Sequence, residues 1–223
     1  MSEIYHIINR GTDKRKIFLD KQDYFRFIHD LFKFNDQNII NSTFYNFKRA
    51  ENEGIESNKK PRKLLADIYT FCLMPNHYHL LVSPKIENGI VKFMHKINMG
   101  YSKYFNQKYK RKGTLFEGRY KSILISKEPH FYHLPYYIHL NPLDIEFPEW
   151  REGKLRNYKQ AIEFLNNYRW SSHLDYLGTK NFPSITNRTF LLEVFGGEKS
   201  YNKSIKKWLE DLELETIRDV ILE

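Results

Sequence analysis

Hydrophobic residues along the chain follow two spacings, one typical of strands and one typical of helices. Short apolar runs predict four strands, over residues 4–9, 68–74, 77–83 and 122–126. Apolar residues three or four positions apart predict helices over residues 20–34, 88–105 and 130–140. Helical spacing continues beyond residue 150. Residues 35–63 are rich in Asn, Asp, Lys and Glu and predict a long insertion.

The order of these elements is strand, helix, insertion, strand, strand, helix, strand, helix. That order is close to the ferredoxin-like split βαβ arrangement, in which helices pack on one face of an antiparallel sheet. The expected fold class is therefore α+β. We expect a principal domain over residues 1–145, which contains the insertion, and a helical C-terminal extension over residues 146–223 that packs partly on it.

The composition narrows the class of protein. A length of 223 residues is enough to bury a substantial core. The single cysteine, Cys72, excludes a disulfide framework and a multi-cysteine metal site. No apolar run reaches the length of about 18 residues that a membrane span requires, and the N-terminus lacks the apolar stretch of a signal peptide. We therefore expect a cytoplasmic protein with no membrane partner.

The net charge of +9 is unevenly distributed. Residues 101–121 alone carry a net charge of +6, and aromatic residues are interleaved with the basic ones. Cations neutralise phosphates and aromatic rings stack on unpaired bases, so this segment predicts contact with single-stranded nucleic acid. Its predicted DNA-binding residues are Lys103, Lys110, Arg111, Lys112, Arg119 and Lys121. The alternative is a solvated helix end whose aromatic side chains turn inward.

A His-x-His triplet begins the third predicted strand. Side chains two positions apart on a strand point to the same face, so His77 and His79 are separated by about 7 Å along it, and both imidazoles can converge on one cation. Tyr78 and Leu80 then face the opposite way, toward a core. The alternative is that the histidines only cover a polar face of the sheet.

Tyr137 and Asn141 lie four positions apart at the end of the last helix of the principal domain, so their side chains share one face of it. The amide oxygen of Asn141 is a suitable ligand for a hard divalent ion. The alternative is that Tyr137 is a core aromatic residue and that Asn141 simply ends the helix before Pro142.

Five motifs occur in order: NRG (9–11), MPNHYHLL (74–81), GTLFEGRYK (113–121), YIHLNP (137–142) and RWSS (169–172), the last followed by YLG (176–178). Together they make residues 4–178 resemble the single-tyrosine HUH transposases. These are the insertion-sequence transposases and their domesticated relatives, the repeat-associated tyrosine transposases. The fifth motif resembles the tail of the repeat-associated branch.

The resemblance implies that His77 and His79 hold Mg²⁺ or Mn²⁺, with Asn141 as a third ligand, and that Tyr137 is the nucleophile. It implies a metal-dependent single-stranded DNA endonuclease and strand transferase that cleaves near hairpin-forming DNA through a 5′-phosphotyrosine intermediate. The expected partner is single-stranded DNA with hairpin or palindromic elements. A homodimer, as in mobile members, and a monomer, as in the repeat-associated branch, both stay open.

Some residues compete with these assignments. Tyr136 is an alternative nucleophile, although the spacing to Asn141 favours Tyr137, and Pro135 is expected to interrupt their helix. Three further histidines suggest a zinc site, although scattered helical histidines usually bind none; they are His130, His133 and His139.

Arg10, Arg119 and Lys121 are the expected contacts to the DNA backbone, with ordinary surface charge as the alternative. A rival function is a non-catalytic module that binds structured single-stranded nucleic acid or represses its own gene. A replication-initiator or relaxase-type nickase is a third interpretation, which the short chain without a P-loop disfavours.

Overall fold

A four-stranded antiparallel sheet forms the centre of the molecule. The computed structural model describes residues 3–38, 62–212 and 214–222, so most of the predicted insertion over residues 35–63 lies outside the described residues. The strands are β1 (Tyr5–Arg10), β2 (Ala66–Met74), β3 (His77–Pro84) and β4 (Lys121–Leu124). Their order in the sheet is β2-β3-β1-β4, and β2 and β3 form a hairpin that turns at Pro75 and Asn76. The predicted α+β class with an antiparallel sheet is confirmed.

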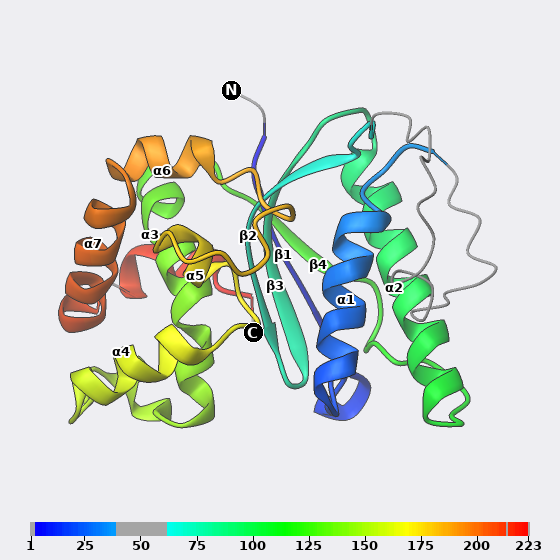
Figure 1. Ribbon diagram of the computed structural model, residues 1–223, viewed down its shortest axis with the longest axis horizontal. Coiled ribbons are helices and arrows are strands. Elements are labelled where there is room, and N and C mark those ends of the chain that lie inside the picture. Colours follow the sequence, from blue (N-terminus) through cyan, green and yellow to red (C-terminus); the bar gives the residue numbers. More distant parts are fainter. Residues whose placement is uncertain (1–2, 39–61, 213, 223) are drawn as a thin grey trace, which may run out of the picture.

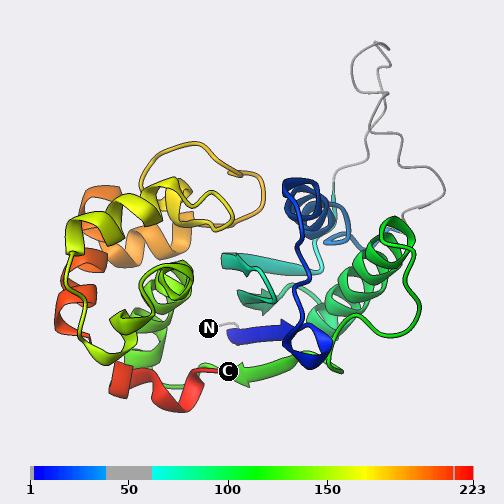
Figure 2. The ribbon, with the colours of Figure 1, turned by 90° about the horizontal axis from the view of Figure 1, so that it is seen from below.

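Helices cover both faces of this sheet (Figure 1). The α-helices are α1 (Lys21–Lys33), α2 (Gly89–Lys108), α3 (Glu128–Leu140), α4 (Tyr158–Asn167), α5 (His173–Tyr176), α6 (Thr189–Phe195) and α7 (Glu198–Asp211). As Figure 2 shows, α1 and α2 lie on one side of the strands, whereas α3 and the helices after it lie on the other. The sequence predicts helices on one face only; the second face is also covered, because it presents apolar side chains such as Leu81 that require burial.

Alternating residues of the strands supply two hydrophobic cores. Ile7, Tyr78 and Leu80 point toward α1 and α2 and are fully buried there. The opposite face contributes Cys72 and Leu81 to a second core, which also contains much of α3 and of the C-terminal helices. Tyr78 and Leu80 therefore face a core, as the strand period predicts.

Two local features of the helices depend on single residues. Asp20 and Asp23 form a reciprocal capping box at the start of α1, in which the Asp20 side chain accepts from the Asp23 amide. α3 continues through Pro135, so the predicted interruption is wrong. A proline removes only one backbone donor, and the residues of α3 from Leu134 to Leu140 are all buried by packing that holds the helix in place.

The C-terminal extension attaches to the free edge of β2. Ser171 forms an isolated antiparallel bridge with Cys72, and the backbone amide of Leu73 donates to the carbonyl of Trp170 at 2.9 Å. Trp170 also stacks on Tyr24 of α1, with 4.5 Å between ring centroids. The RWSS motif therefore extends the sheet edge and joins the two layers. No helix among the described residues has the length and hydropathy needed to cross a membrane.

Three 3₁₀ segments complete the second layer: η3 (Asn141–Ile145), η4 (Pro148–Glu152) and η5 (Leu214–Val220). The first two continue the chain directly from α3. The third lies along α3 near the C-terminus, where Asp219 pairs with Lys127 at 2.7 Å and with His130 at 2.9 Å. Of these segments, η4 and η5 bring residues that follow the predicted principal domain to the second face of the sheet.

Candidate active site

The two histidines of the His-x-His triplet lie on the sheet face that is covered by α3. Their ring centroids are 4.9 Å apart and the rings are nearly perpendicular. His79 is fully buried and His77 is half-buried. The Nε2 atoms of both rings are buried and have no hydrogen-bond partner among the described residues. Buried polar atoms are normally satisfied, so two such atoms side by side indicate a place for a missing ligand.

The hydrogen bonds of His77 define which ring nitrogen carries its proton. The Asn76 amide donates through Nδ2 to the carbonyl of Lys14, which directs its Oδ1 toward His77. That oxygen lies 2.7 Å from His77 Nδ1, and a carbonyl oxygen only accepts. His77 Nδ1 therefore carries the hydrogen, and Nε2 of the neutral ring is a free lone pair.

Burial keeps both rings neutral at physiological pH. Desolvation, with the nearby Arg10 guanidinium as the next contribution, lowers the pKa of His77 to about 4. Desolvation, with His77 as the next contribution, holds the pKa of His79 well below its usual range. Neutral imidazole is the form that binds metal ions.

Tyr137 of α3 meets this histidine pair, and Asn141 follows directly after that helix. Tyr137 is fully buried, and its ring stands edge-on to that of His79 with 6.1 Å between centroids. The Asn141 side chain donates to the backbone carbonyl of Tyr137 at 2.8 Å. The helical spacing of four residues thus places the Asn141 side chain against the backbone of Tyr137, on the shared side that the sequence predicts.

Arg151, in η4, is hydrogen-bonded to both Tyr137 and Asn141, and the sequence pattern does not predict this role. Its Nη1 donates to the Tyr137 hydroxyl and its Nη2 donates to Asn141 Oδ1, both at 3.1 Å. Asp144 holds the same guanidinium through two oxygens, at 2.7 Å and 2.6 Å. The positive charge is therefore fixed against the tyrosine oxygen. No spacing rule points to Arg151, because its contacts depend on the turn between η3 and η4.

The competing nucleophile, Tyr136, points into the second core. Its ring packs on Phe195 and Tyr201, with centroid distances of 5.0 and 5.7 Å. Burial raises the pKa of its hydroxyl. Of the two adjacent tyrosines, Tyr137 is the one that contacts His79.

The three other histidines are engaged separately. His130 pairs with Asp219, His133 accepts from the Trp208 indole at 2.8 Å, and His139 is bonded at 2.7 Å to the hydroxyls of Tyr201 and Ser172. No group of three or more His, Cys, Asp or Glu side chains within residues 3–38, 62–212 and 214–222 is arranged to hold a metal ion. The candidate donor set at the triplet is two imidazoles and one amide.

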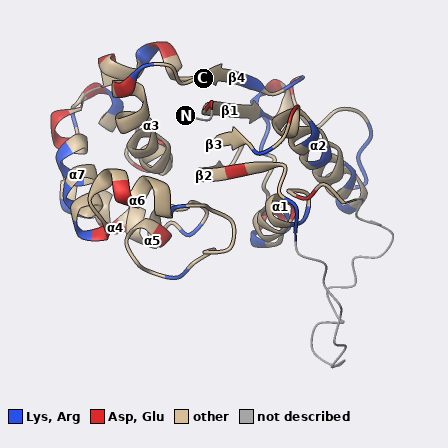
Figure 3. Cartoon of the chain, turned by 90° about the horizontal axis from the view of Figure 1, so that it is seen from above, with Lys and Arg blue, Asp and Glu red and all other residues tan. Residues whose placement is uncertain are grey.

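The basic residues of the predicted DNA-binding segment divide into two groups. Arg10, Arg119 and Lys121 line one cavity of about 240 Å³. Arg10 is paired with His77 across β1 and β3, so this cavity adjoins the histidines. The remaining residues lie on or just after α2, on the other side of the sheet (Figure 3): Lys103, Lys110, Arg111 and Lys112.

The aromatic residues of the same segment do not form an open stacking surface. Tyr101 and Phe116 are buried in the first core. The hydroxyls of Tyr104 and Tyr109 donate to the Asp23 carboxylate of α1. Here the alternative of inward-turned aromatic side chains is correct, because the apolar face of α2 needs a partner and α1 supplies it.

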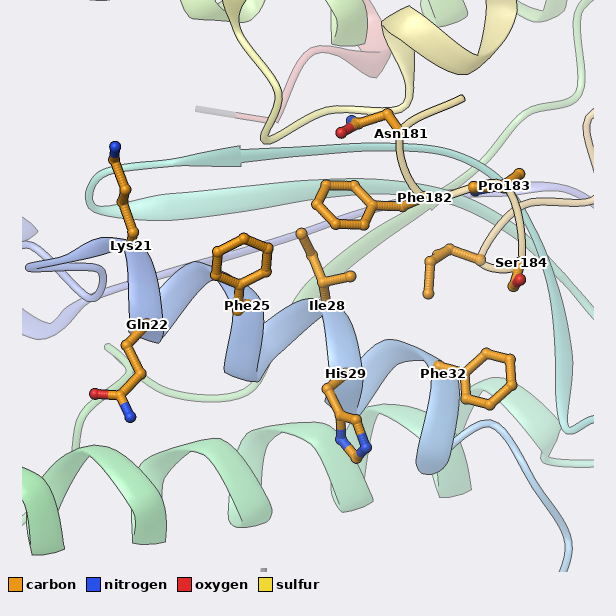
Figure 4. Close-up of a pocket in the computed structure, with 11 residues that line it drawn as sticks. Lys21, Gln22, Phe25, Ile28, His29, Phe32, Asn181, Phe182, Pro183 and Ser184 are labelled. Carbon is orange, nitrogen blue, oxygen red and sulfur yellow. The ribbon is translucent and has the colours of Figure 1, made fainter. Parts of the chain in front are cut away.

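A larger cavity, of about 810 Å³, lies away from the histidines, between α1 and residues 181–185 (Figure 4). Phe25 and Phe182 face each other across it, with 6.2 Å between ring centroids. It belongs to the α1 side of the sheet and contains none of the candidate site residues.

With the geometry established, the chain was compared with known proteins. Residues 55–141 match the model of the family described as "Transposase IS200 like". This part of the chain is similar to the IS200-like transposases. The predicted resemblance to these transposases is thereby confirmed over residues 55–141.

The transposase match ends at Asn141, so it contains both histidines, Tyr137 and Asn141 but not Asp144, Arg151 or any part of β1. A solved structure described as a REP-associated tyrosine transposase bound to a REP hairpin is similar at 12% identity and a TM-score of 0.41, over 66% of this chain and 69% of that one. A search of curated proteins found no match.

Proposed function

We propose that this protein is a transposase of the IS200-like type, a metal-dependent endonuclease and strand transferase for single-stranded DNA that contains hairpins, with Tyr137 as nucleophile. The observation that carries the proposal is the pair of buried, unpartnered Nε2 atoms of His77 and His79, together with the Tyr137 ring that stands edge-on to His79. A tyrosine in a purely structural core does not need a pair of neutral imidazole lone pairs in its surroundings.

His77, His79 and Asn141 are the residues that would hold Mg²⁺ or Mn²⁺. Asn141 Oδ1 accepts one hydrogen bond from Arg151, and an amide oxygen has a second lone pair for an ion. Such an ion, when bound, supplies Lewis-acid polarisation of the scissile phosphate. The two imidazoles are neutral and correctly protonated for this role before any ion arrives.

Arg151 provides the means to activate the nucleophile. A phenol has a pKa of about 10 and is mostly protonated at neutral pH. The guanidinium that donates to the Tyr137 hydroxyl favours the phenolate, because an adjacent positive charge stabilises the ionised form. Asp144 keeps that charge in position.

In the proposed step, the Tyr137 hydroxyl gives up its proton to a water molecule at the site, and its oxygen attacks phosphorus. A bond forms between phosphorus and the tyrosine oxygen while the bond to the 3′ oxygen breaks, and that oxygen takes up a proton as a free 3′-hydroxyl. The phosphodiester energy is retained in the 5′-phosphotyrosine. A second 3′-hydroxyl can therefore reverse the step and join strands without ATP. Arg10, Arg119 and Lys121 would hold the backbone beside the site.

The test is covalent capture. Purified protein is incubated with Mn²⁺ and a pool of 3′-labelled single-stranded oligonucleotides that carry a hairpin and randomised flanks. We expect a labelled protein band that resists denaturation. Tyr137→Phe should abolish it without loss of DNA binding, whereas the matched control Tyr136→Phe should retain it. An undiminished band in Tyr137→Phe refutes the assignment. DNA binding without cleavage under either metal favours the non-catalytic module.

A further inference from the structure

A third histidine, outside the His-x-His motif and outside the family match, contacts the site. His6 lies on β1 on the same face as His79, and its Nε2 is 3.0 Å from His79 Nδ1. The two rings are stacked, with 5.2 Å between centroids and an interplanar angle of 16°. Both side chains are fully buried. Through this contact, His6 can determine which nitrogen of the His79 ring carries the hydrogen.

The direction of the bond between the two histidines follows from a third group. His6 Nδ1 lies 2.7 Å from the backbone carbonyl of Val220, at the end of η5. A carbonyl only accepts, so His6 Nδ1 carries the hydrogen. Burial favours a neutral ring, which leaves His6 Nε2 as an acceptor. His79 must then donate through Nδ1, and its own Nε2 is left as a bare lone pair.

We propose that His6 is a positioning residue: anchored by the Val220 carbonyl, it holds His79 in the tautomer whose Nε2 can bind a metal ion. The assignment of a metal role to His79 rests on the proposed function; the tautomer does not. Val220 and His6 are 214 positions apart, so the two ends of the described chain meet to prepare one ligand.

The two candidate ligands are prepared in the same way from different places. His77 is fixed by its neighbour Asn76, which Lys14 orients in turn. His79 is fixed by His6 and Val220. Both arrangements put the hydrogen on Nδ1 and leave Nε2 unpartnered. Two independent sets of hydrogen bonds thus place the hydrogen on Nδ1 in both candidate ligands. This agreement indicates that the site requires this tautomer.

Ring-nitrogen NMR of the full-length, metal-free protein tests the tautomer without metal, DNA or activity. Long-range ¹H–¹⁵N correlation spectra distinguish a protonated Nδ1 from a protonated Nε2. We expect His79 to carry its hydrogen on Nδ1 in the wild type and to shift toward the Nε2-protonated form in His6→Leu. A wild-type His79 with its hydrogen on Nε2 overturns the proposal, and this result does not depend on whether any variant folds.

Mn²⁺ binding, measured from the free-ion EPR signal, tests the consequence. His6→Leu should weaken binding by roughly 10- to 100-fold, the usual effect of losing a group that orients a ligand. His6→Gln should restore most of it, because an amide can accept from His79 and donate to Val220. The matched control is His173→Leu, a buried histidine bonded to Tyr201 that does not contact the site; it should leave Mn²⁺ affinity unchanged.

These outcomes separate the two proposals. Unchanged Mn²⁺ affinity in His6→Leu overturns the role of His6 while leaving the proposed nickase intact. A wild-type protein that binds no Mn²⁺ and forms no DNA adduct refutes the proposed function, and the NMR spectra then still decide whether His6 sets the tautomer of His79.

Discussion

The two faces of the central sheet come from the same strands and serve different purposes. On the α1 and α2 face, Tyr78, Leu80 and Val82 of β3 enter a continuous apolar core. On the opposite face, the intervening residues His77 and His79 lie beside His6 of β1. Successive residues of one strand therefore belong alternately to the apolar core and to the candidate site, because successive side chains point to opposite faces.

The faces also differ in how they are closed. The first is covered by α1 and α2, which are close in sequence to the strands that they cover. The second is closed by α3, η4 and η5, and it contains buried polar groups that need specific partners. We therefore expect the first face to control stability through packing and the second to control reactivity through individual hydrogen bonds.

The largest contrast should come from neighbouring residues of β3. Leu80→Ala removes a fully buried side chain and should lower the free energy of unfolding by about 2–5 kcal/mol, with Mn²⁺ affinity of the folded protein unchanged. His77→Ala removes a half-buried candidate ligand and, under the proposed function, should abolish Mn²⁺ binding and the DNA adduct, with a much smaller loss of stability. Urea unfolding and EPR measure the two effects. Comparable destabilisation by both substitutions would contradict the division of roles.

The next largest effect should be that of Arg151→Gln on the rate of adduct formation. Without the guanidinium, the Tyr137 oxygen loses a charged donor, and the rate of adduct formation should fall by roughly 10²-fold, as when one preorganised donor is removed from a reacting oxygen. The measurement is single-turnover capture of labelled DNA. Arg111→Gln, which removes a guanidinium bonded to Asn106 on the α2 side, is the matched control and should react at the wild-type rate. A wild-type rate in Arg151→Gln would exclude its role in activation.

Acid should destabilise the second face selectively. Burial lowers the pKa of His6 and of His173 from 6.5 to about 4, so the unfolded chain binds more protons between these values. Stability should fall as the pH drops from about 6.5 to about 4, by about 1.4 kcal/mol per group and pH unit, and then level off with respect to these groups. Urea titrations at several pH values measure this, and His173→Leu should reduce the slope. An unchanged slope would show that His173 is not a source.

The smallest effects concern DNA affinity. Lys121→Ala removes a cation beside the histidines and should weaken binding of a single-stranded hairpin several-fold, with a reduction of the salt slope by about 0.7. Lys103→Ala, on the exposed surface of α2, should leave both quantities unchanged if the DNA lies on the histidine face. Equal losses in both variants would place the DNA on both sides of the sheet.

Much of this arrangement follows from local pattern. The strand period predicts that His77 and His79 share a face and that Tyr78 and Leu80 share the other; the helical period predicts that Tyr137 and Asn141 project together. These relations hold within single elements, whose geometry depends on neighbouring residues. The ordered motifs likewise predict the similarity to IS200-like transposases that residues 55–141 show.

The charge and aromatic content of a segment are less informative, because they do not show toward which face each side chain points. One basic, aromatic segment predicts a continuous DNA groove, yet Tyr101 and Phe116 turn into the core while Arg119 and Lys121 reach the histidine face. The apolar faces of α1 and α2 pack against each other, and this packing buries the aromatic rings away from solvent.

By itself, the sequence determined the strands and helices, the candidate nucleophile and the pair of candidate metal ligands. Only the tertiary structure decided which groups prepare them. Arg151 reaches Tyr137 through the turn after α3, and His6 reaches Val220 across 214 positions. Such contacts obey no period along the chain, because they arise when separate elements pack together and each buried polar group must find a partner.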